Sequence, residues 1–247
     1  YVHNRVETIE AAAERVRRLV PGARIAIGHG QMAEGMLERV MLDFADGRFD
    51  VFALTGQSGA IKKQQLPQPG DNYAIVDLKS VGLKTGIASP WLKPSLAIID
   101  PTTTETLPGG VVAATGFDVL THAVESYTAR PYTSRPRPAH PSQRPPYQGS
   151  TPYNDIGAIA AIRLGGKYLV RAVRDASDTE ARHQLMFAST LAGLAFGSAG
   201  VHIPHAMSYS VATLKHEFTA AGYQELEAMV THGIAVVINA PAALRFT

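Results

Sequence analysis

Apolar and polar positions over the first 55 residues alternate between helical spacing and short apolar runs, which predicts an α/β segment. Apolar residues at helical spacing run from Val6 to Val20, where Pro21-Gly22 would stop the helix. Strands are expected at 24–28 and 51–54, and a second helix at 36–44. We interpret the order as β-α-β-α-β, which calls for parallel strands joined by right-handed crossovers.

The pattern beyond residue 105 is mainly helical. The stretch 116–129 is expected to be a helix that packs through a stripe of four apolar residues. These are Phe117, Leu120, Val124 and Tyr127. Further helices are expected at 155–174, 177–196 and 200–209. The predicted fold class is therefore an α/β N-terminal part followed by a mostly α-helical domain.

Two stretches lack periodicity. Residues 56–72 are rich in Gly, Pro, Gln and Lys and are expected to be a linker. Residues 130–154 contain many prolines and are expected to be a long loop on one domain rather than a boundary between two. Ser177 and Glu180 have the spacing of a capping box, which predicts the start of the helix that follows them.

Asp118 and His122 are the first candidates for chemistry. Residues four apart on a helix share one face, so both side chains are expected to project from a largely packed helix. A buried carboxylate needs a partner, and a metal cation is one such partner. His205 and His232 follow in apolar, Gly-flanked segments, and one carboxylate with three imidazoles suits Fe²⁺ or Zn²⁺. An Asp-x-x-x-His pair alone is more typical of a helix-face ion pair than of a metal site. His205 and His232 alone are more typical of core or loop histidines than of ligands.

Composition narrows the classes of function. The net charge of +2 over 247 residues, with scattered basic residues, makes nucleic acid an unexpected partner. No apolar run approaches the roughly 18 residues of a membrane span, and no secretion signal is evident. We therefore expect no membrane partner and a cytoplasmic location. The absence of cysteine excludes disulfides and thiolate ligands.

Three segments carry a family resemblance. The run IIDPTTTETLPGGVVAATGFDVLTHAVE (98–125) resembles the signature of the iron-containing alcohol dehydrogenases. GLAFGSAGVHIPHAMSY (193–209) resembles the second signature of that family, and THGIAVV (231–237) resembles its third metal-ligand segment. SYTARPY (126–132) and RPPYQGS (144–150) are most similar to the hydroxyacid–oxoacid transhydrogenase branch. The resemblance covers residues 73–247.

The resemblance implies metal ligation by Asp118, His122, His205 and His232. It makes Tyr209 a cavity-lining candidate, because many family members have a substrate-side histidine there. His202 lies three residues before His205 and is expected to face the same cavity, in a structural or supporting position rather than as a ligand. Glu125 shares the ligand face and is expected either to orient His122 or to form an ordinary ion pair. Lys84 aligns with a lysine that contacts cofactor in the family, or is an ordinary solvated lysine.

The resemblance also implies the partners of an intact relative. They are NAD(P), a small alcohol or 2-hydroxy acid and a second copy in a homodimer, with the mitochondrial matrix as an alternative location. The sequence lacks the family's Gly-rich phosphate loop, and the family continues with further helices beyond residue 247. We therefore expect a truncated helical domain and an oxidoreductase that is weak or inactive.

Residues 1–55 resemble a different family, through NRVETI, IAIGHGQM and LERVMLDFADGRFDV. These match the second RecA-like motor domain of transcription-repair coupling factors, which implies a chimeric chain. No G-x-x-x-x-G-K-[ST] motif is present, so the motor's ATP-binding domain is not expected. A nucleic-acid-associated translocase fragment and a non-functional chimera therefore remain alternatives to the oxidoreductase.

The resulting domain organisation has four parts. It comprises a RecA-like α/β segment (1–55), a linker (56–72), a remnant of a dinucleotide-binding α/β domain (73–105) and a helical metal-binding domain (106–247). As a further hypothesis, residues 1–55 replace the missing nucleotide half by adding to a parallel sheet with strands near 73–78 and 96–100.

Overall fold

A computed structural model gives the fold of the chain in two compact units. The N-terminal unit comprises Tyr1–Leu66 and Tyr73–Ile98, and the helical unit comprises Pro67–Asn72 and Ile99–Thr247. The structure describes residues 2–3, 8–30, 46–58, 73–78, 83–88, 99–145, 147–213 and 230–247, with single positions within 32–44 and at 97 and 218.

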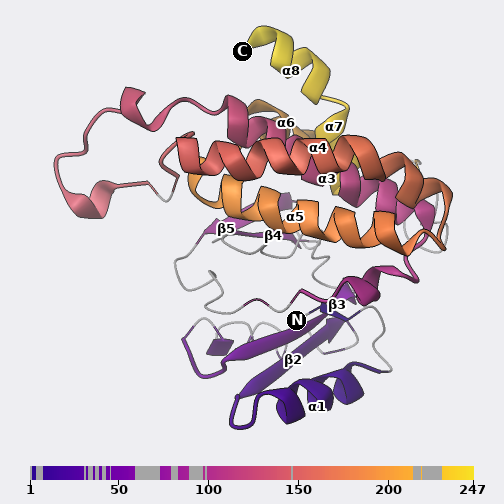
Figure 1. Cartoon of the computed structure of the whole chain (residues 1–247). Coiled ribbons are helices and arrows are strands. Elements are labelled where there is room, and N and C mark those ends of the chain that lie inside the picture. The colour runs from indigo at the N-terminus through magenta and orange to yellow at the C-terminus, as the bar shows by residue number, and fades with distance from the viewer. Residues whose placement is uncertain are drawn as a thin grey trace. The chain divides into compact units, whose positions relative to one another are not determined.

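The N-terminal unit contains a parallel three-stranded sheet with one described helix against it (Figure 1). Its elements are β1 (Val2–His3), α1 (Ile9–Leu19), β2 (Ile25–Gly30) and β3 (Val51–Ser58), and the strand order is β1-β3-β2. Ile9, Ala13 and Val16 of α1 pack against Ile25 of β2. The described positions within 36–44 are helical, but the rest of that helix lies outside the described residues. The complete β-α-β-α-β unit therefore stays a prediction.

Strand β3 runs further than expected and shortens the predicted linker. It pairs with β2 from Ile25 opposite Val51 to Gly30 opposite Ser58, with a register shift between Gly28 and Gly30. Residues 56–58 therefore belong to the sheet, because they continue the ladder beyond the irregularity. The remaining part of the linker, 59–72, lies outside the described residues.

Strands β4 (Tyr73–Leu78) and β5 (Leu83–Ala88) form a separate antiparallel pair, with Tyr73 opposite Ala88. The expectation that 73–78 extends the parallel sheet is therefore wrong. Four residues separate the two strands, which is too short for the crossover that parallel pairing needs. The described positions near 96–100, which are 97, 99 and 100, are not in a strand.

Arg24 and Asp50 join the start of β2 to the turn before β3. The guanidinium donates to both carboxylate oxygens at 2.8 and 3.0 Å, and the Arg24 amide donates to Asp50 Oδ2 at 2.8 Å. The Arg24 side chain and amide together lower the pKa of Asp50 to about 2. A lowered carboxyl pKa adds stability above the ordinary pKa, and that contribution is lost as the pH falls through the lowered value.

We therefore expect the wild type to exceed Asp50→Asn in stability by a small, constant amount near neutral pH. The difference should disappear between about pH 4 and pH 2, where Asp50 itself becomes protonated. Hydrogen exchange of the β2 amides across this pH range measures it. A difference that grows toward low pH would contradict the assignment.

The helical unit is built on three long helices that lie side by side (Figure 1). The described helices are α3 (Gly109–Thr128), α4 (Pro152–Arg174), α5 (Thr179–Ala199), α6 (Ile203–Thr213), α7 (His232–Val237) and α8 (Ala240–Phe246). Small residues bring the long helices close, with Ala123, Ala161 and Ala188 in one core cluster. Residues 99–105 also belong to this unit, because Arg182 of α5 donates to the carbonyls of Thr104 and Leu107.

The predicted apolar stripe of α3 is wrong in part. Phe117 and Tyr127 are exposed to 39% and 48%, while Asp118, His122 and Glu125 are buried. The helix contacts α4, α5 and α7, and it turns its small and polar residues toward them. The apolar stripe predicted from the sequence is therefore not the face of α3 that is most deeply buried.

Two helix starts are fixed by side chains. Thr151 accepts from the Asn154 amide at the start of α4. At the start of α5 the cap is Asp178, which accepts from the Ala181 amide, rather than the expected Ser177. Ser177 is instead held by Asp175, which accepts from both its amide and its hydroxyl.

The proline-rich stretch between α3 and α4 is irregular and closes at its base. Its described residues hold only two short 3₁₀ turns, Tyr132–Ser134 and Pro141–Gln143. The Tyr132 amide donates to Ser150 O, and the Ser150 amide donates to Arg130 O, both at 3.1 Å. Gly149 is in the left-handed region at φ 99°, where an added Cβ would collide with Arg130 O.

None of the described helices is by itself long and apolar enough to cross a membrane. The pair Thr179–Ala199 and Ile203–Ala212 passes the test of length and composition together, with a bend of 104°. The first of these helices is a core element of the helical unit.

Candidate metal centre

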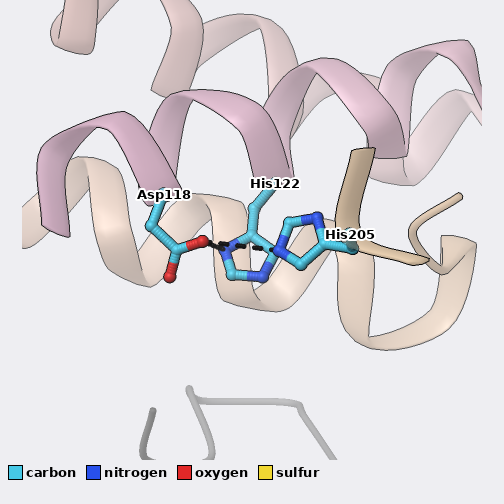
Figure 2. A group of neighbouring side chains, drawn as sticks. All are labelled: Asp118, His122 and His205. Atoms are coloured by element: carbon cyan, nitrogen blue, oxygen red, sulfur yellow. Dashed lines mark ion pairs between the residues drawn. The ribbon is translucent and has the colours of Figure 1, made fainter. Parts of the chain in front are cut away.

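Helix α3 presents Asp118 and His122 on the same buried face, one turn apart (Figure 2). The His122 Nδ1 atom lies 3.7 Å from Asp118 Oδ1. Residues at i and i+4 of a helix are neighbours on its surface, so this part of the arrangement follows from the local sequence.

Two further helices bring imidazoles to the same carboxylate oxygen. His205 in α6 places its Nε2 atom 3.4 Å from Asp118 Oδ1, and His232, the first residue of α7, places its Nε2 atom at 3.6 Å. One ligand atom from each of Asp118, His122 and His205 lies within 4.8 Å of the others. The structure thus brings the three predicted histidine ligands to Asp118. Asp118, His122 and His205 form the tightest group.

The group fits a divalent cation. Asp118 Oδ1 and His205 Nε2 are buried and have no hydrogen-bond partner in the described part of the chain. Leaving such atoms unpaired costs about 1–3 kcal/mol each, and a bound cation would satisfy both. One carboxylate and three imidazoles are hard or borderline donors, which suit Fe²⁺ and Zn²⁺.

Burial and neighbouring charges set the protonation of the group. Burial raises the pKa of Asp118, but the surrounding imidazoles of His122, His232 and His205 outweigh it and lower that pKa. Burial lowers the pKa of His122 to about 4, which keeps the ring neutral. For His205, burial lowers the pKa, but contacts with Asp118 and Glu125 raise it to about 9.

His122 is also held by a side chain that the sequence analysis did not select. Its ring stacks on Phe196 of α5, with centroids 4.2 Å apart and planes 9° apart. It also stacks on His205 at 4.3 Å. Phe196 carries no polar atom and belongs to no ligand motif, so nothing in the sequence separates it from an ordinary core residue.

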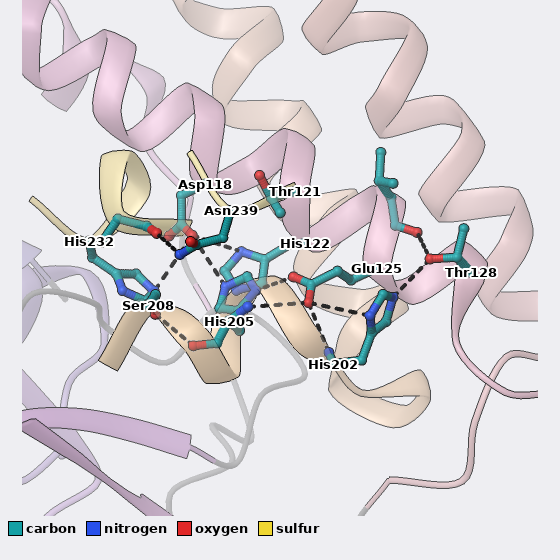
Figure 3. A network of polar contacts seen from close by, with 12 residues as sticks. Asp118, Thr121, His122, Glu125, Thr128, His202, His205, Ser208, His232 and Asn239 are labelled. Atoms are coloured by element: carbon teal, nitrogen blue, oxygen red, sulfur yellow. Dashed lines mark hydrogen bonds and ion pairs between the residues drawn. The ribbon is translucent and has the colours of Figure 1, made fainter. Parts of the chain in front are cut away.

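Glu125 contacts a different histidine from the one expected. It lies fully buried beside His205, whose Nδ1 atom contacts Glu125 Oε2, and it does not contact His122 in any hydrogen bond that the structure describes (Figure 3). Its position seven residues after Asp118 places it almost two turns along α3. From there its carboxylate meets His205 and the start of α6.

His202 lies at the edge of this network. Its Nε2 atom is 2.9 Å from Thr128 Oγ1, and its Nδ1 atom is 3.9 Å from Glu125 Oε1 (Figure 3). The Thr128 hydroxyl donates to Val124 O, so its oxygen accepts from His202. His202 is therefore placed outside the group around Asp118, in a supporting position.

The other two candidate residues are not part of the described group. Tyr209 lies in α6, one turn beyond His205, and is half-buried. Lys84 lies in β5 of the N-terminal unit, and its side chain is outside what the structure describes. Neither residue's predicted role is tested by this geometry.

Gly233 permits the close approach of α7 to α3. A Cβ atom there would collide with the carbonyl oxygen of Ala114 and lie 3.2 Å from the Asp118 Cβ. We expect Gly233→Ala to push α7 away, separate His232 from Asp118 and weaken metal binding. Gly166→Ala on α4 is the matched control, because nothing lies within 4 Å of its Cβ. Thermal unfolding and Zn²⁺ titration of both variants measure the effect; equal behaviour would contradict it.

Comparison with known proteins shows which family the chain resembles. The family model for the Fe-containing alcohol dehydrogenase family, C-terminal, matches residues 147–247. An iron-containing alcohol dehydrogenase from Thermococcus thioreducens shares the fold with a TM-score of 0.59 and 23% identity, over 99% of this chain and 59% of that chain. The expected resemblance to this family is thereby confirmed.

The curated relatives are more specific. The chain is 50% identical over 175 residues to the hydroxyacid-oxoacid transhydrogenase, mitochondrial, of Rattus norvegicus, and 49% identical to that of Homo sapiens. Each match covers 70% of this chain and 38% of the relative, so the chain spans well under half of their length. These matches support the resemblance to hydroxyacid-oxoacid transhydrogenases over this part of the chain.

Proposed function

We propose that the helical unit is the metal-binding part of a metal-dependent alcohol dehydrogenase or hydroxyacid–oxoacid transhydrogenase. The observation that carries this proposal is the buried group around Asp118 Oδ1, with three imidazole nitrogens within 3.4–3.7 Å. Asp118, His122, His205 and His232 would hold Fe²⁺ or Zn²⁺. When bound, the ion supplies Lewis-acid polarisation of an alcohol or carbonyl oxygen.

The protein's own groups position that chemistry. Phe196 and His205 sandwich the ring of His122 and fix its plane. Burial of Asp118 and His205 keeps water from competing for the ligand atoms. Glu125 accepts from the backbone where α6 begins, which holds His205 in place.

The finer assignments rest on the relatives and on the sequence. On this basis we propose a 2-hydroxy acid as the substrate class, with a small alcohol as the alternative, and NAD(P) as cofactor with Lys84 contacting it. A homodimer is proposed, and a location in the mitochondrial matrix follows the names of the relatives, with the cytoplasm as the alternative.

The proposal is tested by metal content and hydride transfer. The purified chain is expected to bind about one equivalent of Fe²⁺ or Zn²⁺ and to lose it to a chelator. Reduction of NAD⁺ by a 2-hydroxy acid, or exchange between a 2-hydroxy acid and a 2-oxo acid, should then be metal-dependent. Metal binding without hydride transfer supports the metal centre but not the enzyme. No metal binding would refute both.

The parallel strands of residues 1–55 favour a second candidate, a fragment of a nucleic-acid translocase. The resemblance to transcription-repair coupling factors and the chimeric origin of the chain remain proposals. A salt-sensitive DNA-binding titration tests this candidate, because phosphate contacts weaken steeply with salt. ATPase activity at background is expected, since the sequence has no phosphate-binding motif of that class. If neither this titration nor the metal assay is positive, a non-functional chimera remains.

A further inference from the structure

We propose that Glu125 is a positioning residue that fixes both the ring of His205 and the start of the helix that carries it. This inference rests on the proposed metal centre. It concerns a carboxylate outside the predicted ligand set, on a helix different from that of His205.

One oxygen of Glu125 caps helix α6. Glu125 Oε1 accepts from the His202 amide at 2.9 Å and from the His205 amide at 3.3 Å (Figure 3). The first amides of a helix have no carbonyl partner within it, and the positive end of the helix dipole favours a carboxylate. The cap comes from α3, so α6 begins at a point set by the same helix that carries Asp118 and His122.

The other oxygen orients the imidazole. Glu125 Oε2 contacts Nδ1 of His205, and the opposite nitrogen, Nε2, faces Asp118 Oδ1 at 3.4 Å. An acceptor at Nδ1 keeps a proton on that nitrogen, so Nε2 is the nitrogen that would give up its proton and offer a lone pair to an ion. Partners of this kind fix the tautomer and the plane of a ligating histidine.

Burial makes this arrangement selective for a carboxylate. Glu125 is 0% exposed, so water does not replace either acceptor. A glutamine has the same shape but only one oxygen. If that oxygen caps α6, the amide NH₂ faces His205 and donates to Nδ1, which moves the ring proton to Nε2. If the oxygen faces His205, the NH₂ group lies against the amides of His202 and His205 and cannot accept from either of them.

The test compares Glu125→Gln with wild type by Zn²⁺ titration against a competing chelator. Zn²⁺ affinity of the variant is expected to fall about 10–100-fold, the range for partners of metal-ligating histidines. Circular dichroism should show that the helices remain. Glu105→Gln, which changes a half-exposed glutamate of the same unit, is the matched control and should bind as wild type.

The outcomes separate this inference from the function on which it depends. Failure of wild type to bind Zn²⁺ overturns the metal centre itself. Equal affinity of wild type and Glu125→Gln overturns the role of Glu125 and leaves the centre intact. Should the variant not fold, ¹⁵N NMR of Zn²⁺-loaded wild type decides. A proton on Nδ1 of His205 is expected, and a proton-free Nδ1 would overturn the inference.

Discussion

Substitution of His205 by alanine is expected to abolish stoichiometric metal binding. The affinity for Zn²⁺ should fall by more than about 100-fold, beyond the range for groups that only support a ligand. His205 provides the Nε2 atom nearest to Asp118 Oδ1, at 3.4 Å, and it comes from a helix remote in sequence from the Asp118–His122 pair. Without His205, no imidazole from α6 reaches Asp118, and only three of the four predicted ligands remain.

The stability of the protein should report the same loss. A ligand at a thousand times its dissociation constant stabilises the folded state by about 4 kcal/mol. Added Zn²⁺ is therefore expected to raise the Tm of wild type and to leave that of His205→Ala unchanged. His183→Ala is the matched control, because this half-buried histidine of α5 lies beside Glu105 rather than Asp118. A full equivalent of metal retained by His205→Ala would remove this residue from the ligand set.

Substitution of Arg182 by alanine should produce the largest loss of stability in the helical unit. The side chain is 2% exposed and donates to the carbonyls of Ala172, Thr104 and Leu107, at 3.1, 2.5 and 3.0 Å. It ties the segment before α3 to the end of α4. The variant removes the Arg182 donors from one buried and two partly buried carbonyls, of which Thr104 O keeps the Leu107 amide as a donor. Each carbonyl left unpaired costs about 1–3 kcal/mol, and the lost side chain opens a cavity.

We expect Arg182→Ala to lower the free energy of unfolding by about 3 kcal/mol or more and the Tm by roughly 6–12 °C. Arg163→Ala on the exposed side of α4 is the control and should change the Tm little. Metal-free protein should be used for both, so that metal binding does not mask the difference. Similar unfolding of the two variants would show that the buried arginine is dispensable.

The candidate site was predicted well where its geometry is local. Asp118 and His122 are four residues apart, and helical geometry alone places them together. His205 and His232 were selected through family resemblance, because no spacing rule links them to α3. Their arrival near Asp118 depends on how α6 and α7 pack, and Gly233 is one residue that makes this packing possible.

In the fold, too, local features could be predicted and tertiary ones could not. The starts and ends of several helices could be predicted from periodicity and stop signals, as for α1 before Pro21-Gly22. The buried face of α3 could not, because it carries Asp118, His122 and Glu125 while the large Phe117 and Tyr127 lie partly in solvent. The pairing of β4 with β5 was not predicted, because the sequence of a strand does not specify which strand it pairs with.

By itself the sequence determined where several helices lie, the pairing of Asp118 with His122 and the family that the chain resembles. These features depend on backbone geometry over a few residues and on motifs that can be read in order. Only the tertiary structure decided that His205 and His232 meet Asp118, that Phe196 stacks on His122 and that Glu125 serves His205. Such contacts join segments about 70–115 residues apart, and they depend on close packing between helices, which no local pattern encodes.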